Sequence, residues 1–98
     1  MRTKDVIYLG TVTETLVDGE VVRSTSWAIR FVRKLSVRSK EYYEARAIQL
    51  KPELMFEIRS IDYSDQTRLK YSDVEYEIIR TYDKGEITEL ICSRMPRG

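Results

Sequence analysis

The chain has 98 residues, which is enough for one domain with a modest core. Hydrophobic residues make up 42% of it and charged residues 34%, which is the composition of a globular protein rather than of a disordered one. It contains no histidine and a single cysteine, Cys92, so histidine-based general bases, Cys–His nucleophile pairs, zinc clusters and an intrachain disulfide are excluded. We expect no signal peptide and no membrane partner, because no apolar run approaches the roughly 18–20 residues that a bilayer span needs.

Charge is distributed unevenly along the chain, although the net charge is only +1. Residues 22–52 contain eight basic and two acidic side chains, a net charge of +6. Residues 53–98 contain seven basic and ten acidic side chains, a net charge of −3. This asymmetry suits an anionic partner, or copies of the chain that stack positive side against negative side.

Short β-branched and aromatic runs separated by turn signals predict a mainly β protein. The Asp18-Gly19 dipeptide is the strongest hairpin signal in the chain. Strands are predicted at residues 6–12, 21–37, 54–61, 68–71, 74–78 and 87–93. We therefore expect one domain over residues 1–98, built as a small six-stranded antiparallel β-barrel or sandwich, with residues 94–98 as a flexible tail.

The alternation of apolar and polar residues within the predicted strands indicates which side chains form the core. The bulky apolar residues occur every second position, as they do on the buried face of a half-buried strand. The predicted structural core is Trp27, Ile29, Phe31, Phe56, Ile58, Tyr76, Ile78 and Ile91. Gly10, inside the first strand, predicts a bulge or a close approach of another group.

Residues 36–54 differ from the rest and form the one long mid-chain loop, with a partly helical pattern. Tyr43, Ala47 and Leu50 fall on one face of a 3.6-residue repeat, Ser39 is suited to cap the start, and Pro52 ends the pattern. A helix of about twelve residues is marginal alone in water, so we expect it to order only against a packing partner. Long excursions in small domains are usually functional or disordered.

The sequence offers little for catalysis. The four glycines are scattered, so there is no phosphate-cradling loop, and the carboxylate pair Glu75 and Glu77 fits a solvated strand face. We expect neither an enzyme nor a cofactor or metal site. The open alternative is a nucleic-acid-binding barrel, because small barrels bind single strands with a positive groove and exposed aromatic rings, and this chain has seven tyrosines.

Several short sequence words occur in one order across residues 21–92, most of the chain. The ordered set resembles the head–tail joining, or head-closure (stopper), proteins of bacteriophages with long non-contractile tails. The words are Trp27-Ala28-Ile29, Arg38-Ser39-Lys40-Glu41-Tyr42-Tyr43-Glu44-Ala45, Phe56-Glu57-Ile58-Arg59, Arg68-Leu69-Lys70-Tyr71 and Tyr76-Glu77-Ile78.

This resemblance implies a structural virion protein, made in the bacterial host cytoplasm and placed at the head–tail interface. Such a protein assembles as a ring, usually dodecameric, between a portal-side adaptor and a tail-end protein. The ring closes the DNA-filled head, gives the tail a docking surface, and passes double-stranded DNA through its channel without sequence readout. A tail-terminator or adaptor subunit of the same connector is the neighbouring alternative.

The loop that closes the channel in that family corresponds to about residues 36–54 here. In a ring, we expect its Tyr pair and small apolar residues to meet neighbouring subunits, and its basic residues to meet DNA phosphates or acidic faces of the next subunit. The predicted subunit-interface or channel residues are Arg38, Lys40, Glu41, Tyr42, Tyr43, Ala45, Arg46, Ala47 and Leu50.

Overall fold

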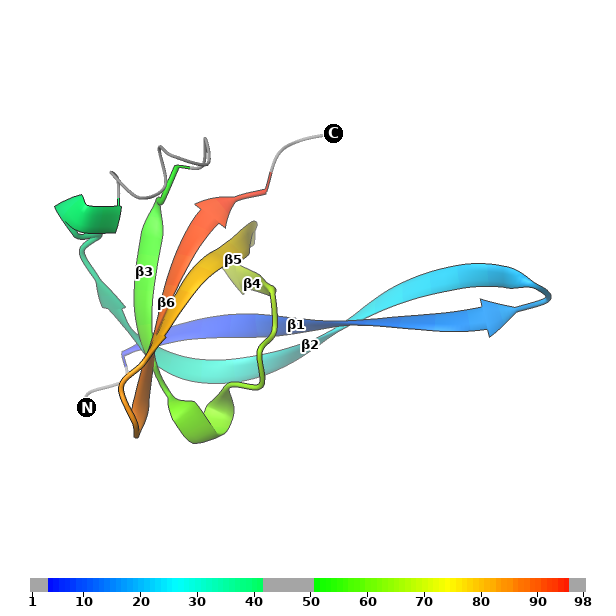
Figure 1. The fold of residues 1–98 in the computed structure, drawn as a ribbon, viewed down its shortest axis with the longest axis horizontal. Coiled ribbons are helices and arrows are strands. Elements are labelled where there is room, and N and C mark those ends of the chain that lie inside the picture. Colours follow the sequence, from blue (N-terminus) through cyan, green and yellow to red (C-terminus); the bar gives the residue numbers. More distant parts are fainter. Residues whose placement is uncertain (1–3, 42–50, 96–98) are drawn as a thin grey trace.

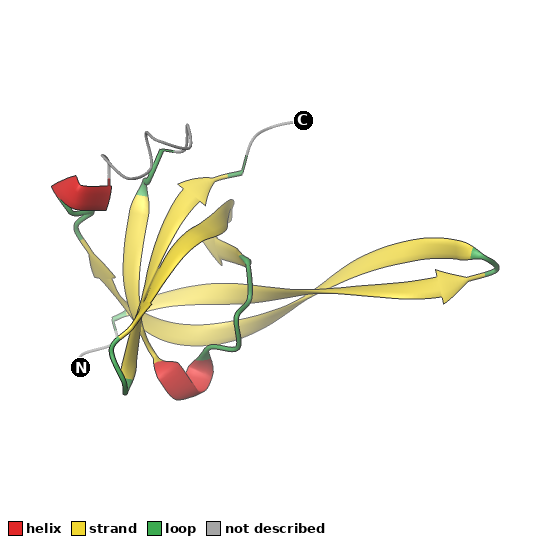
Figure 2. Ribbon diagram, viewed as in Figure 1, coloured by secondary structure: helices red, strands yellow, loops and turns green. Residues whose placement is uncertain are grey.

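A computed structural model describes residues 4–41 and 51–95 of the chain. The described strands are all antiparallel and close into a barrel in the order β1-β2-β3-β6-β5-β4 (Figures 1 and 2). The predicted mainly β fold is therefore confirmed, and it is a barrel rather than a sandwich. The elements are β1 (Asp5–Val17), β2 (Glu20–Leu35), β3 (Leu54–Arg59), the 3-10 turn η1 (Ser60–Asp62), β4 (Arg68–Tyr71), β5 (Val74–Asp83) and β6 (Ile87–Arg94).

The first two strands are much longer than the barrel needs. β1 pairs with β4 only over Tyr8–Gly10, and β2 pairs with β3 only over Arg33–Leu35, whereas all of β1 pairs with β2 from Glu20 to Val32. Their distal halves therefore leave the barrel as a two-stranded arm, which Figure 1 shows projecting to one side. The molecule measures 47 × 30 × 25 Å.

The arm ends in the predicted Asp18-Gly19 hairpin. Both residues have positive φ, 51° and 81°, and the pair Val17↔Glu20 closes a two-residue loop. This is the type I′ geometry whose twist matches that of the flanking strands, and glycine adopts it without steric cost.

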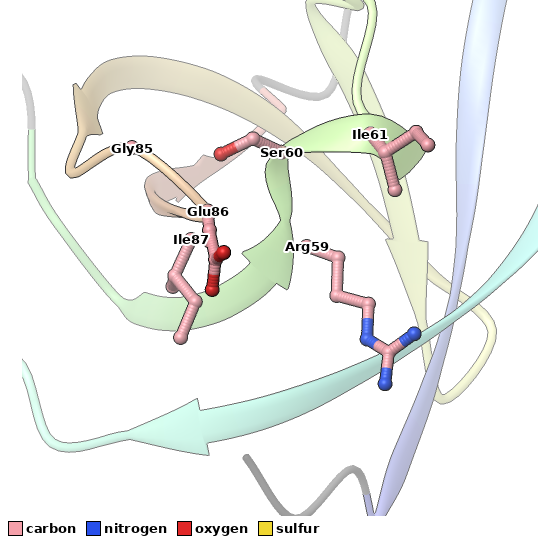
Figure 3. Close-up of a pocket in the computed structure, with 6 residues that line it drawn as sticks. All are labelled: Arg59, Ser60, Ile61, Gly85, Glu86 and Ile87. Carbon is pink, nitrogen blue, oxygen red and sulfur yellow. The ribbon is translucent and has the colours of Figure 1, made fainter.

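One end of the barrel is closed by η1 and the β5–β6 turn. The Ser60 amide donates to the Glu86 carbonyl at 2.9 Å, and the Ser60 and Thr88 hydroxyl oxygens lie 2.8 Å apart. Beside them is an open hollow of about 500 Å³, lined by Arg59, Ser60, Ile61, Gly85, Glu86 and Ile87 (Figure 3).

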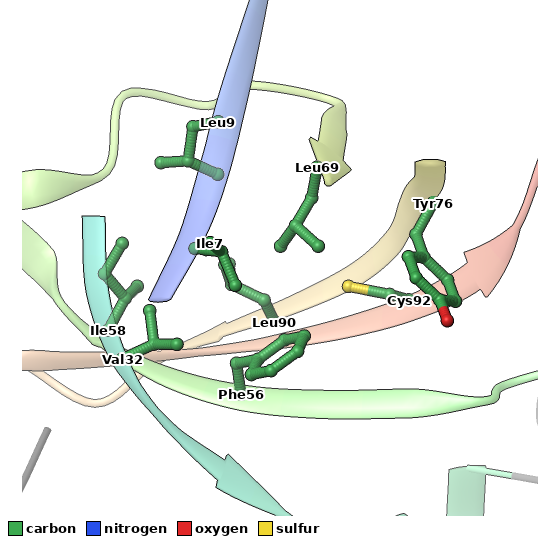
Figure 4. Packing of buried hydrophobic residues seen from close by; sticks show 9 residues of the cluster. All are labelled: Ile7, Leu9, Val32, Phe56, Ile58, Leu69, Tyr76, Leu90 and Cys92. Atoms are coloured by element: carbon green, nitrogen blue, oxygen red, sulfur yellow. The ribbon is translucent and has the colours of Figure 1, made fainter. Parts of the chain in front are cut away.

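The core fills the barrel interior. Figure 4 shows its side chains converging from several strands, with Cys92 of β6 among them. Phe56, Ile58 and Tyr76 lie there as predicted, and Ile78 packs against the cluster from its edge. The buried cluster consists of Ile7, Leu9, Val32, Phe56, Ile58, Leu69, Tyr76, Leu90 and Cys92.

The core prediction for β2 is wrong, because the interior row of this strand is the even-numbered one. Ile7 and Leu9 are fully buried and stand opposite Arg30 and Ala28, so residues of that parity face inward. Ile29 and Phe31 are 49% and 57% exposed, and Trp27 lies half-buried on the same outer face. Both rows of β2 contain apolar residues, and the bulkier row is on the outside.

Two smaller predictions also change. Ile91 is buried but has the parity opposite to Leu90 and Cys92, so it faces away from the barrel interior. Of the predicted flexible tail, Arg94 ends β6 and the Met95 amide donates to the Glu75 carbonyl at 3.2 Å, which ties both residues to the barrel. Residues 96–98 lie outside the described part of the chain.

Candidate functional site

A bulge in β5 creates an outward-facing polar cluster on the barrel. The register against β6 shifts between Ile78 and Arg80, so Ile78 still pairs with Cys92 while Arg80 pairs with Ile91 and Tyr82 with Glu89. Because a one-residue shift moves the following side chains to the opposite face, Arg80 and Tyr82 point outward beside Glu89.

Glu41 meets this cluster from the start of the long loop. Residues 39–41 are helical, and the Glu41 carboxylate is completely buried. It accepts hydrogen bonds from the Tyr82 hydroxyl at 3.2 Å and from Arg38 Nη2 at 3.4 Å, and Arg80 Nε lies 3.6 Å from it. A buried carboxylate is stable only when it is paired in this way, so Glu41 anchors the loop to the barrel wall.

Glu89 is a second buried carboxylate in the same cluster. Lys84 Nζ donates to its Oε2 at 2.9 Å, and its Oε1 lies 3.0 Å from Arg38 Nη2 without the alignment of a hydrogen bond. Arg38 thus bridges Glu41 and Glu89 from the solvent side.

Three cationic side chains lie close to the ring of Tyr82. The Arg38 and Arg80 Cζ atoms lie 5.3 and 5.4 Å from the ring centre, and Lys40 Nζ lies 5.1 Å from it. Burial and the hydrogen bond to the Glu41 carboxylate raise the pKa of Tyr82. The ring therefore stays neutral and attracts the cations through its π face.

The far end of the loop is also attached to β6. The Glu53 amide donates to the Cys92 carbonyl at 2.8 Å, and the Arg94 amide donates to Glu53 Oε2 at 2.7 Å. Pro52 is buried, and so is Met55, which pairs with Ile91 on the outer face of the sheet. Both described ends of the loop are thus held against the outside of the barrel.

These contacts change the predicted roles of two loop residues, Glu41 and Arg38. Glu41 is sealed within its own chain, so its prediction as a subunit contact is wrong. Arg38 finds acidic partners within the chain rather than on a neighbour, whereas Lys40 is exposed. The remaining predicted positions, Tyr42, Tyr43, Ala45, Arg46, Ala47 and Leu50, lie outside the described residues, so their roles stay predictions.

A second surface feature is one face of the β1–β2 hairpin, which the sequence pattern assigns to the core or to a turn. Directly opposed residues of antiparallel strands share a face, and here the pairs Val6↔Phe31, Tyr8↔Ile29, Val12↔Thr25 and Leu16↔Val21 form a single outward row. Most of this row is apolar and exposed, up to 75% for Leu16 and 61% for Val21. We call the barrel end of this row, Val6, Tyr8, Trp27, Ile29 and Phe31, the root patch.

The opposite face of the arm is polar near the barrel, whereas near the tip it carries the exposed side chains of Val17 and Val22. Thr11, Thr13 and Thr15 alternate along β1, and the Thr13 and Ser24 hydroxyl oxygens lie 2.9 Å apart across the strands. The part of the arm nearer the barrel is therefore an amphipathic ribbon. Its signal in the sequence is the row of hydroxyl residues at odd positions of β1, which requires the even positions to carry the apolar side.

A hollow of about 530 Å³ lies at the root patch. Val6, Tyr8 and Trp27 line its apolar side, and Lys70, Ser72 and Asp73 line its polar side. Lys70 Nζ lies 4.2 Å from the centre of the Trp27 ring, so it provides positive charge beside the exposed rings.

Within 4–41 and 51–95, no group of three histidine, cysteine or acidic side chains is placed to hold a metal ion. Burial raises the pKa of the Cys92 thiol to about 12, which leaves it protonated and unreactive. Burial also raises the pKa of Tyr63 to about 12, and its hydroxyl donates to the Gln66 carbonyl at 2.8 Å.

Among the described residues, no helix is both long enough and apolar enough to cross a bilayer. No protein-family model matches the sequence, and no curated protein matches it at a significant level.

Proposed function

We propose that this chain is a structural subunit of the head–tail connector of a long-tailed bacteriophage. It forms a ring below the portal-side adaptor, helps to close the DNA-filled head, and offers a docking surface to the tail. The resemblance in the order of sequence words supports the phage assignment, and those words fall on β2, the loop start, β3 and the β4–β5 hairpin of one barrel.

The observation that carries the proposal is the exposed apolar face of the β1–β2 hairpin. Soluble monomers rarely expose long contiguous apolar surfaces, and such surfaces usually mark contacts with other proteins. The polar ends of the loop bind their own barrel, whereas Ile29, Phe31 and Leu16 face outward. This arrangement is suited to assembly with other chains rather than to catalysis.

The attached loop ends refine the proposed gating. Glu41 and Glu53 hold the two described ends of the loop to the barrel, while Lys40 beside Glu41 stays exposed to a neighbouring subunit or to DNA. The DNA contacts proposed for the loop are made to phosphates and carry no sequence information.

Deleting the gene from the phage or prophage that encodes it tests the connector function. Filled heads that lose their DNA, together with unattached tails, are the expected products in electron micrographs of the lysate. Supplying the wild-type chain in trans should restore joined, infectious particles. Normal particles from the deletion strain would overturn the proposal.

The root patch favours a second candidate, a nucleic-acid-binding barrel. Tyr8, Trp27 and Phe31 are aromatic residues on the barrel wall beside Lys70, a combination that binds single strands by stacking and charge. Fluorescence anisotropy with single-stranded and duplex oligonucleotides at two salt concentrations tests it. Tight binding that falls steeply with salt and weakens in Tyr8→Ala would favour this candidate over the connector.

A further inference from the structure

Among the described residues, the arm has no strand partner outside the hairpin, and only its first residues, Thr11 and Val12, line a small hollow together with residues 64–67. Along residues 11–17 and 20–26, the ladders of the described residues connect β1 and β2 only to each other. A lone two-stranded ribbon is marginally stable in water, and its outer edges present unpaired backbone groups. The molecule is 47 Å long with the arm extended. We therefore expect contact with another surface to stabilise the arm.

The two ends of the apolar row are complementary in side-chain size and in charge. On this face the tip exposes aliphatic Leu16 and Val21 beside the acidic turn residue Asp18, while Glu20 pairs with Val17 on the other face. The root patch exposes larger apolar side chains, with Lys70 on one side. Arg33 follows Phe31 in the same outward row, where Glu57 contacts it at 3.3 Å.

The arm as a whole is negatively charged, like its tip. Residues 11–26 contain three acidic side chains and one basic side chain, Arg23, a net charge of −2. Arg23 is itself paired with Glu14 at 2.8 Å in the middle of the apolar row. The acidic tip is therefore repelled by another tip and attracted to Lys70 at the margin of the root patch, where Asp73 lines the same hollow.

From this complementarity we infer that the arm of one copy docks its tip onto the root patch of a second copy. Leu16 and Val21 pack against Ile29, Phe31 and Tyr8 of the next chain, and Asp18 approaches its Lys70. The contact joins two different surfaces, so each copy uses its tip on one neighbour and its root patch on the other. A head-to-tail contact of this kind closes a ring or continues as a filament.

This inference rests on the proposed assembly and identifies its interface. A nucleic acid is a poorer occupant of the whole row, because aliphatic side chains predominate at the tip and the arm is negatively charged.

Site-specific crosslinking tests the contact directly. Leu16→Cys chains and Ile29→Cys chains are mixed and treated with a short bismaleimide, which joins two thiols without an oxidant. The mixture should give a mixed crosslinked dimer, and neither variant alone should do so. The native Cys92 is buried, so the wild-type chain serves as the blank. Thr15→Cys, one residue away on the opposite face of the arm, replaces Leu16→Cys in the matched control and should give no product with Ile29→Cys.

Sedimentation velocity supplies the second measurement. Leu16→Glu should weaken self-association about tenfold or more, the effect of losing a central apolar contact, while Thr15→Glu adds the same charge on the other face and should change it less than about threefold. Both positions are exposed, and circular dichroism checks that the fold is retained.

Three results would overturn the inference. They are a wild-type chain that stays monomeric up to about 1 mM, crosslinks formed by Leu16→Cys or Ile29→Cys alone in place of the mixed product, and oligomers that persist in Leu16→Glu. None of these decides the connector function, which the gene deletion tests separately. Conversely, a mixed crosslink together with normal particles from the deletion strain would support the contact between copies and contradict the proposed connector function.

Discussion

The indole ring of Trp27 lies across the backbone of Gly10, its cross-strand partner on β1. A Cβ atom on residue 10 would come within 2.7 Å of Trp27 Cζ3, closer than side chains approach one another in proteins. The predicted close approach at Gly10 is therefore confirmed. Glycine at this position lets the ring lie flat on the barrel wall where the arm begins.

Gly10→Ala should therefore destabilise the protein by about 1–3 kcal/mol, because the added methyl group must displace the ring. Urea unfolding measures the loss. Trp27 is the only tryptophan, so its emission maximum should also shift as the ring moves. Thr11→Ala, next along the strand and exposed, is the control and should stay within about 0.5 kcal/mol of wild type. Equal stabilities for the two variants would contradict this account of the contact.

The two phenylalanines should behave very differently when truncated. Phe56 is fully buried in the core, whereas Phe31 is exposed on the root patch. Phe56→Ala should cost about 3–5 kcal/mol of unfolding free energy, and Phe31→Ala less than about 1 kcal/mol. The same urea titration compares them. A large loss of unfolding free energy in Phe31→Ala would show that Phe31 belongs to the core.

The contrast between these residues shows where sequence patterns suffice. Strand identity, the Asp18-Gly19 hairpin and the number of strands follow from local alternation and turn residues, which act over a few positions, whereas closure into a barrel rather than a sandwich does not. The inward face of β2 does not follow, because both of its rows contain apolar residues. Only the register against Ile7 and Leu9 of β1 decides which row is inside, and register is a tertiary property.

The polar cluster at the loop start is also beyond prediction from local patterns. The bulge after Ile78 reverses the facing of Arg80 and Tyr82, and no glycine or proline marks it in the sequence. The local pattern around Glu41 indicates only a residue favoured by a helix dipole near a free loop. Its real partners come from β5, about forty residues away along the chain, so that pattern contains no sign of them.

Neutralising the loop anchor should loosen residues 36–41. Glu41→Gln keeps the shape but removes the charge that compensates Arg38 and Arg80, and we expect a loss of about 1–3 kcal/mol, limited by the partial exposure of both arginines. Tyr82→Phe removes one hydrogen bond and should cost about 1 kcal/mol. Urea unfolding and hydrogen exchange of the 36–41 amides measure the two effects.

A double-mutant cycle isolates the bond between Glu41 and Tyr82. The combined variant should be less destabilised than the sum of the two single losses, since each substitution already removes the same interaction. Strict additivity would show that the 3.2 Å contact contributes nothing in solution.

Alkaline pH should destabilise the fold through Cys92. Burial raises the pKa of its thiol from 9.0 to about 12, so the unfolded chain loses this proton first as pH rises. The stability linked to the thiol is therefore complete below about pH 9 and declines between pH 9 and 12. Tyr63, whose pKa is raised from 10.0 to about 12, adds to the decline from about pH 10.

Urea unfolding at a series of pH values measures this decline. Cys92→Ala removes the thiol, so in this variant the fall in stability should begin about one pH unit later, when tyrosine becomes the first group to titrate. A wild-type profile that is flat from pH 9 to 10 would show that the thiol is not shielded as the structure has it.

The β4–β5 turn contains a site where a single substitution should stabilise the protein. Ser72 and Asp73 both have positive φ, 50° and 63°, and the pair Tyr71↔Val74 closes a two-residue loop of the same type as the Asp18-Gly19 hairpin. A side chain in the left-handed region is strained, and glycine is not. Asp73→Gly should therefore raise the free energy of unfolding by about 0.5–1 kcal/mol and the melting temperature by about 2–8 °C, as differential scanning calorimetry would measure.

The matched reverse change is Gly19→Ala. Residue 19 has φ 81°, and nothing lies within 4 Å of the point where a Cβ atom would stand, so the substitution tests backbone strain alone. It should lower the unfolding free energy by about 1 kcal/mol, opposite in sign to Asp73→Gly. If both variants lost stability, Asp73 would have to make a contact that outweighs its strain, and the hollow that Asp73 lines together with Lys70 is where that contact would lie.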